Sequence, residues 1–201
     1  MTMRVPPALV PWLLASAAVV AGLLWHAGDR IAAVGQVVVT GTADVGGSFQ
    51  LVDQDGHARS DSDFRGRYML IYFGYSLCPD VCPTTLAVMA DALAKLGPRH
   101  DKIVPVFITI DPDRDTPKAL KSYLAAFGPD FVGLTGKPDI VKKVAASYHV
   151  FYQKHPLSRG GYSLDHTSVL YLMGPDGKFV TYYGDESIGP DGLAADLKKR
   201  V

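Results

Sequence analysis

Two uninterrupted apolar runs dominate the middle of the chain. They are Tyr68–Tyr75 (YMLIYFGY) and Ile103–Ile110 (IVPVFITI). Runs of this length without alternating polar residues are typical of strands buried on both faces, as in a parallel sheet. Between them, apolar residues in 83–97 (PTTLAVMADALAKLG) recur at helical spacing until Gly97 ends the pattern. The pattern predicts a strand–helix–strand unit.

The same signals predict elements on both sides of this unit. Upstream, 46–66 alternates around Asp-Gln-Asp-Gly, which indicates a hairpin. Downstream, the predicted elements are a helix with Thr116 as N-cap and Pro117 in its first position, a strand in 131–136, a helix from about Pro138, two strands in 168–184 around Pro-Asp-Gly, and a closing helix in 189–200 with basic residues at its end.

This order of elements predicts an α/β fold with a mixed central sheet flanked by helices. A parallel strand–helix–strand unit followed by a terminal hairpin and helix is the order of a thioredoxin-like fold. We expect this domain to occupy residues 46–201. Such folds place ligand chemistry at the carboxyl ends of their strands.

The amino-terminal pattern differs from the rest. Residues 5–27 contain no Asp, Glu, Lys or Arg, and about 20 apolar residues suffice to cross a bilayer as a helix. Arg4 precedes the segment, so we expect the amino terminus to stay in the cytoplasm and the remainder to be exported. The predicted domains are a membrane anchor (1–28), a linker (29–45) and the thioredoxin-like domain.

A cleaved signal peptide is the alternative for this segment. Its apolar region is usually about 7–15 residues long, and no clear A-x-A site follows the run. An Arg- and Ser-rich mitochondrial leader is not visible either. We therefore expect a single-pass protein of the bacterial inner membrane whose carboxyl-terminal domain lies in the periplasm, where disulfides persist.

The balanced charge of the chain disfavours one class of function, nucleic-acid binding. The chain has 20 basic and 20 acidic residues and no run of Lys or Arg, so nothing favours nucleic-acid binding. Residues 1–28 contain Arg4 and no acidic residue, which leaves the exported part with a net charge of −1.

The only two cysteines, Cys78 and Cys82, follow the first apolar strand. With a helix starting at about Pro83, Cys82 is predicted at its N-cap and Cys78 in the connecting loop. Free N–H groups and the helix dipole lower a thiol pKa there. Two such thiols can close a disulfide or bind one soft metal ion.

Three rival interpretations apply to the pair. A structural disulfide across so small a loop would stabilise weakly. A thioredoxin-type redox pair usually has two intervening residues, whereas this pair has three. A peroxidase is disfavoured because its Pro-x-x-x-Thr-x-x-Cys pattern is missing.

A metal site needs a further ligand, and the chain has six histidines. His166 lies just before the strand predicted at 168–173. In a thioredoxin-like fold, the start of that strand faces the cysteine loop. For the other five we expect surface or packing roles. Two thiolates and an imidazole suit Cu(I), and also Cu(II) when a further weak ligand joins. Zinc would prefer four ligands, or three with water. We therefore expect one copper per chain.

Three motifs resemble the SCO/SenC family of copper-handling proteins. They are YFGYSLCPDVCPTTL, FITIDPDRDTP and DHTSVLYLMGPDGKFV, in the family's order. The similarity covers about residues 46–185. Ser76 and Thr167 depart from the commoner Thr and Ser, and neither departure removes a ligand.

The resemblance implies copper ligation by Cys78, Cys82 and His166. It also implies delivery or insertion of copper at the CuA centre of cytochrome c oxidase, whose CuA-bearing subunit would be the partner. This is a metallochaperone role rather than an enzyme activity. Some family members instead act as thiol–disulfide reductases or redox sensors, so the alternative function is an oxidoreductase using the Cys78–Cys82 pair. Because thiolate is the ligand form, only the reduced pair binds copper.

Carboxylates near these motifs are candidates for the outer coordination shell of the copper site. Asp80 or Asp165 could orient His166, because metal-bound imidazoles commonly hydrogen-bond a carboxylate. Helix capping is the alternative for Asp80. Asp111, Asp113 and Asp115 are predicted to form a solvated loop, with Asp111 directed toward the copper site. The Tyr-rich patches are interpreted as core or partner surface.

Overall fold

The computed structural model describes residues 44–158, 160–184 and 189–201. The anchor predicted at 5–27 and nearly all of the predicted linker lie outside these ranges. Within the ranges, no helix is both long enough and apolar enough to cross a membrane.

The main sheet has seven strands in the described part of the chain, in the spatial order β2-β1-β5-β4-β3-β8-β9. Their bounds are β1 Gln50–Asp53, β2 Ala58–Ser60, β3 Tyr68–Gly74, β4 Ile103–Thr109, β5 Val132–Thr135, β8 Val169–Met173 and β9 Phe179–Gly184. Strands β3, β4 and β5 are parallel, and the other neighbours are antiparallel. This is the mixed sheet that the sequence predicts.

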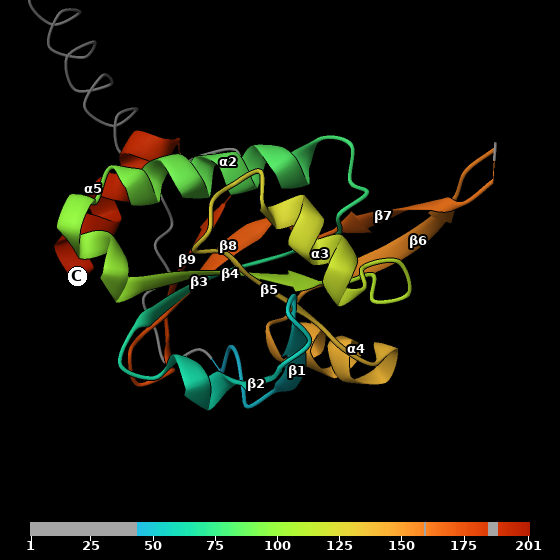
Figure 1. Ribbon diagram of the computed structural model, residues 1–201, viewed down its shortest axis with the longest axis horizontal. Helices are drawn as coiled ribbons and strands as arrows, with labels where there is room; N and C mark the ends of the chain where they lie inside the picture. The colour runs from blue at the N-terminus through green and yellow to red at the C-terminus, as the bar shows by residue number, and fades with distance from the viewer. Residues whose placement is uncertain (1–43, 159, 185–188) are drawn as a thin grey trace, which may run out of the picture. The chain divides into compact units, whose positions relative to one another are not determined.

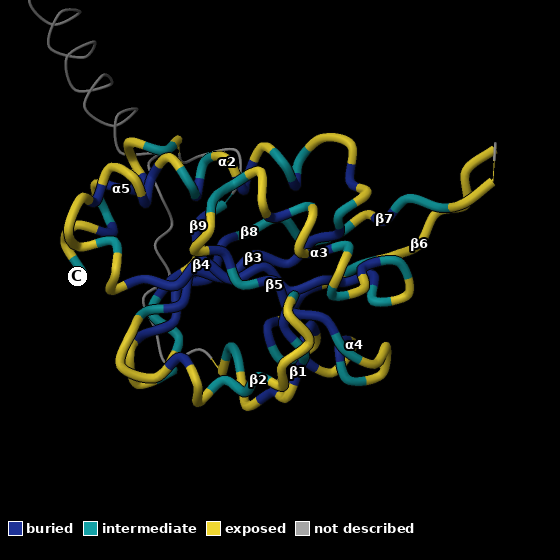
Figure 2. The backbone as a smooth tube through the Cα atoms, in the orientation of Figure 1, coloured by how far each residue is buried: buried dark blue, intermediate teal, exposed yellow. Residues whose placement is uncertain are grey.

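Helices cover both faces of this sheet. Helices α2, α3 and α5 lie on one face and α4 on the other (Figure 1). Their bounds are α2 Val81–Ala94, α3 Pro117–Leu124, α4 Pro138–Ser147 and α5 Pro190–Arg200, with two short 3-10 helices, η2 Asp61–Phe64 and η3 Gly97–Lys102. Every residue of β4 and six of the seven in β3 are buried, and Figure 2 shows these strands dark blue. The two apolar runs therefore form the centre of the core.

Local sequence signals explain most helix starts. The Thr116 hydroxyl accepts the Ala119 N–H at 3.3 Å, which confirms the predicted N-cap of α3. Helix α2 begins at Val81 rather than Pro83, with Asp80 in the N-cap position. Proline is tolerated there because the first-turn N–H groups have no intrahelical partner. Cys82 therefore lies in the first turn, and its predicted N-cap position was wrong.

The segment before His166 forms a hairpin that the sequence pattern did not predict. Strand β6 (Tyr152–Pro156) pairs with β7 (Tyr162–His166) in a separate two-stranded sheet, which extends beyond the main sheet in Figure 1. His166 ends β7 instead of lying in a loop. Strand β6 is exposed along almost its whole length, so it lacks the apolar alternation by which half-buried strands are recognised.

The turn between β1 and β2 is organised by Asp53. Its buried carboxylate accepts the N–H groups of Asp55 at 3.0 Å and His57 at 2.9 Å, and Arg59 Nε at 2.9 Å. Burial acts to raise the pKa of Asp53, but these hydrogen bonds and the Arg59 charge outweigh it and lower the pKa.

Replacing Asp53 with Asn should destabilise the protein by about 1–3 kcal/mol at neutral pH. A carboxyl whose pKa is lowered on folding stabilises fully above its unfolded pKa, and loses that effect as the pH falls through the folded pKa. The deficit of Asp53→Asn should therefore shrink on acidification below about pH 4. Urea unfolding across this range measures it. Asp55→Asn, which removes only an exposed pair with Lys121, is the control and should cost less than about 1 kcal/mol. Equal, pH-independent costs would contradict the assignment.

Candidate metal centre

The fold brings Cys78, Cys82 and His166 together. Cys78 lies in the loop after β3, Cys82 in the first turn of α2, and His166 at the end of β7. Their ligand atoms all lie within 4.8 Å of one another, the one such group of His, Cys, Asp or Glu in the described ranges. Cys82 Sγ is 3.5 Å from His166 Nε2, and both cysteines are free and buried. The geometry therefore joins the three predicted ligands, although His166 follows Cys82 by 84 residues.

Tight local packing fixes the cysteine loop. The Cys78 N–H donates to the Tyr75 carbonyl at 3.2 Å, and the Cys82 N–H points at Cys78 Sγ at 3.5 Å. At Gly74, the last residue of β3, an added Cβ would lie 2.8 Å from Cys82 Sγ and 3.0 Å from the Phe107 ring. Only glycine leaves room for the sulfur at this position.

A buried carboxylate joins the cysteine loop to β4. Asp115 is fully buried, and it accepts the Ser76 N–H at 3.0 Å, the Ser76 hydroxyl, and the Thr109 hydroxyl at 2.6 Å. Asp111 is buried as well, whereas Asp113 is exposed. The prediction of a solvated loop at 111–115 is therefore wrong for two of its three carboxylates, because hydrogen bonds replace water around them.

The His166 ring is held in one orientation. Nδ1 lies 3.0 Å from the Thr167 carbonyl oxygen, which can only accept, so Nδ1 carries the proton. In the neutral imidazole, the lone pair of Nε2 therefore faces the sulfurs. The rings of Tyr72 and Tyr75 stand edge-to-face with the imidazole at centroid distances of 6.1 Å. Sequence reasoning did not predict that these two tyrosines would contact His166. Their positions at the end of β3, just before Cys78, were the available signal.

The predicted outer-shell carboxylates do not contact His166. Asp80 makes no side-chain cap hydrogen bond. The Asp165 carboxylate is 75% exposed and lies 3.0 Å from His155 Nε2. Asp111 instead accepts the Tyr162 hydroxyl at 2.6 Å and Arg114 Nε. The backbone carbonyl of Thr167 takes the orienting role that was assigned to a carboxylate.

The two sulfurs differ in proton affinity. The Cys82 thiol and the N–H groups of Asp80 and Cys82 donate to Cys78 Sγ, which lowers the pKa of Cys78 to about 5 although burial opposes this. The pKa of Cys82 is raised, because its proton is held by the Cys78 sulfur and its side chain is buried. At neutral pH we therefore expect a thiolate at Cys78 and a thiol at Cys82.

This donor set fits a soft metal ion. The lowered pKa favours a thiolate at one sulfur, the second sulfur is adjacent, and the Nε2 atom of a neutral imidazole can present its lone pair to both. Two sulfurs and one nitrogen form a trigonal set suited to Cu(I). Zinc sites use a fourth protein ligand or water.

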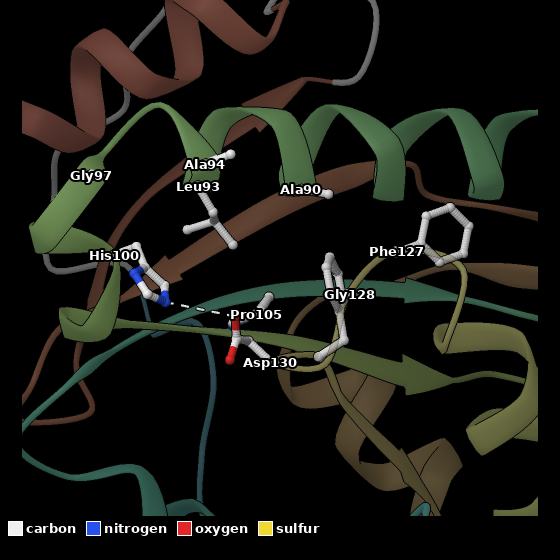
Figure 3. A pocket seen from close by; sticks show the side chains of 10 residues that line it. Ala90, Leu93, Ala94, Gly97, His100, Pro105, Phe127, Gly128 and Asp130 are labelled. Atoms are coloured by element: carbon white, nitrogen blue, oxygen red, sulfur yellow. Dashed lines mark ion pairs between the residues drawn. The ribbon is translucent and has the colours of Figure 1, made fainter.

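A separate pocket of about 460 Å³ is formed by α2, η3, β4 and the loop before β5. Figure 3 shows His100 and Asp130 at this pocket, with His100 Nε2 at 3.6 Å from the Asp130 carboxylate. Its lining is mostly apolar and contains no cysteine. It does not contribute to the metal centre, and His100 has the surface position expected for it.

The thiolate assignment predicts a titration. In the reduced protein, ultraviolet thiolate absorbance should first appear with a midpoint near pH 5, because Cys78 ionises well below its ordinary value. In a Cys82→Ala variant this midpoint should rise, since the donated S–H is lost. A first midpoint near the ordinary thiol value of 9.0 in the unmodified protein would contradict the assignment.

Comparisons with known proteins show which family the chain resembles. The family model described as SCO1/SenC matches residues 38–201. The human protein SCO1 homolog, mitochondrial, is 42% identical over 144 residues, which cover 70% of this chain and 48% of that protein. A Rickettsia conorii SCO2-like protein is 43% identical over 141 residues, 69% of each chain. The chain thus spans about half the length of the human relative and of an Arabidopsis thaliana SCO1 homolog.

Two solved structures show the same fold. Bradyrhizobium japonicum ScoI with copper bound has a TM-score of 0.73 and 44% identity, and the match covers 78% of this chain and 99% of that one. Yeast Sco1 with copper bound has a TM-score of 0.71 and 35% identity, with coverages of 77% and 87%. The family match, these similarities and the arrangement of the sheet and helices show that this chain belongs to the SCO1/SenC family and has its thioredoxin-like fold.

Proposed function

We propose that this protein binds copper through Cys78, Cys82 and His166, and delivers it to, or helps insert it at, the CuA centre of cytochrome c oxidase. The observation that carries the proposal is the convergence of two sulfurs and one imidazole nitrogen within 4.8 Å. Copper is the cargo in this role, with one ion per chain. The CuA-bearing subunit of the oxidase is the proposed partner.

Relatives support the choice of metal and of process. The Bradyrhizobium japonicum, Arabidopsis thaliana and yeast Sco proteins are described with copper bound. A further relative at 25% identity, BsSco, is described as a member of the Sco family of cytochrome c oxidase assembly proteins. These descriptions belong to those proteins. We extend copper binding to this chain because it has two cysteines and one histidine arranged as a matching donor set.

The proposal includes a location. Residues 5–27 are long and apolar enough for a membrane anchor, and Arg4 at their start favours export of the carboxyl-terminal domain. We place that domain in the periplasm, tethered to the bacterial inner membrane.

A thiol–disulfide reductase is the second candidate function. The lowered pKa of Cys78 gives a nucleophilic thiolate at neutral pH, with Cys82 beside it as a resolving thiol. BsSco is described as containing a disulfide switch. This function requires both cysteines and does not require His166.

Copper titration of the reduced full chain separates the two candidates. Wild type should bind one Cu(I), and His166→Ala should raise the Kd by about 100-fold or more, because outer-shell changes alone cost about 10–100-fold. His155→Ala is the matched control, since His155 lies on the same hairpin but pairs with the exposed Asp165. It should leave the Kd unchanged.

Tight binding retained by His166→Ala would overturn the three-ligand site. Equally weak binding by wild type and His166→Ala would favour the reductase. The reductase would then be tested by reduction of a disulfide peptide, which both histidine variants should perform at the wild-type rate.

A further inference from the structure

The metal centre bridges two sheets that share no strand pairing. Hairpin β6–β7 carries His166, while Cys78 and Cys82 belong to the loop and helix that follow β3 of the main sheet. The approach of His166 Nε2 to Cys82 Sγ is set by the two-residue link from β7 to β8 and by the side chains that hold the rest of the hairpin to the domain. These side chains help to set the distance between the imidazole and the two sulfurs.

The principal connection is a cluster of Asp111, Arg114 and Tyr162, called here the Tyr162 clamp. Asp111 accepts the Tyr162 hydroxyl at 2.6 Å and Arg114 Nε. Arg114 Nη1 donates to the Tyr162 carbonyl at 2.9 Å, and its guanidinium lies 3.7 Å from the centroid of the Tyr162 ring. Tyr162 begins β7 and His166 ends it. The clamp therefore fixes the start of the strand whose end supplies the imidazole.

Tyr75 adds a second connection beside the clamp. Its hydroxyl accepts the Leu164 N–H at 3.3 Å, in the middle of β7. Its ring lies 5.7 Å from Arg114 Cζ and 6.1 Å from the His166 ring. Its carbonyl accepts the Cys78 N–H. The clamp, β7 and the cysteine loop therefore meet at Tyr75.

The chemistry of the clamp argues for a geometric role. Asp111 is 1% exposed, and a buried ion pair gives little net stability because both charges lose water. Arg114 Nη2 is also buried without a hydrogen-bond partner in the described residues, an additional cost. The planar guanidinium nevertheless fixes the direction of its donors and stacks on an aromatic face. Such a group defines one arrangement of the strand more strongly than it stabilises the fold.

We propose that Asp111, Arg114 and Tyr162 are positioning residues for the metal site, which keep His166 Nε2 within reach of the two sulfurs. Without the clamp, β7 is held less firmly, and His166 Nε2 is presented to the two sulfurs less often. The inference rests on the proposed function, because it concerns copper held by all three ligands.

The chain contains a matched control for this test. Asp196 accepts the Tyr183 hydroxyl at 2.6 Å and Arg200 Nε at 2.7 Å, which reproduces the Asp–Arg–Tyr chemistry between β9 and α5. Tyr162→Phe and Tyr183→Phe each remove one hydroxyl from a carboxylate and leave the ring in place. The two variants differ in one respect: Tyr162 lies in β7, the strand that carries His166, and Tyr183 lies in β9, which does not carry it.

The Cu(I) Kd of the full chain should rise about tenfold in Tyr162→Phe, the size of an outer-shell effect, and stay at the wild-type value in Tyr183→Phe. In the copper-free protein, hydrogen exchange of the Leu164 amide should speed up in Tyr162→Phe only. The loss of copper affinity should also vanish in the His166→Ala background, because the clamp acts through that imidazole. Asp111→Asn provides a second variant and should follow Tyr162→Phe.

The outcomes separate this inference from the proposed function. A wild type that binds no copper, or a His166→Ala variant that binds as tightly as wild type, overturns both. Wild-type affinity in Tyr162→Phe and Asp111→Asn, while His166→Ala loses copper, overturns the clamp alone. So does an affinity loss that persists in the His166→Ala background, since a purely structural role would weaken the remaining cysteine site equally.

Discussion

The approach of an imidazole on one sheet to two thiols on another is the constraint on which the proposed chemistry depends. Cys82 Sγ and His166 Nε2 are 3.5 Å apart, yet among the described strands β7 pairs only with β6. A donor set built in this way has sulfur ligands fixed by the core and a nitrogen ligand fixed by a separate element. The two kinds of ligand can therefore be perturbed independently, which suits the proposed role of holding a metal ion and giving it up.

Buried polar groups at the carboxyl edge of the sheet make this arrangement specific. Asp115 connects the cysteine loop to the end of β4, and Asp111 connects the next turn to the hairpin. Burial of a carboxylate is costly unless hydrogen bonds replace its water. Asp111 accepts two such bonds and Asp115 accepts three. The same edge lets Cys78 ionise readily, because donors rather than solvent surround its sulfur.

The sequence predicts the parts of this molecule in which local pattern and burial agree. The β3 and β4 runs are continuous because both faces of these strands are buried, and Thr116 caps α3 because its hydroxyl has a free N–H to accept. Strand ends, topology and the family resemblance together predict Cys78, Cys82 and His166 as ligands, and the structure places their ligand atoms together.

The misses have physical causes. Strand β6 is exposed, so burial left no alternating pattern in its sequence. In the sequence, the segment that contains Asp111 and Asp115 has the pattern of a solvated loop. The two carboxylates are buried because they bond to distant partners, Tyr162 and Ser76, which the local sequence does not reveal. The orienting partner of His166 is a backbone carbonyl, and a backbone atom leaves no trace in residue identity.

The most direct test of the central claim is X-ray absorption at the copper edge of the Cu(I)-loaded full chain, beside its His166→Ala variant. The account predicts two sulfur neighbours and one imidazole nitrogen around copper, with the nitrogen contribution lost in the variant. A sulfur-only environment in the wild type, identical to that of His166→Ala, would contradict it.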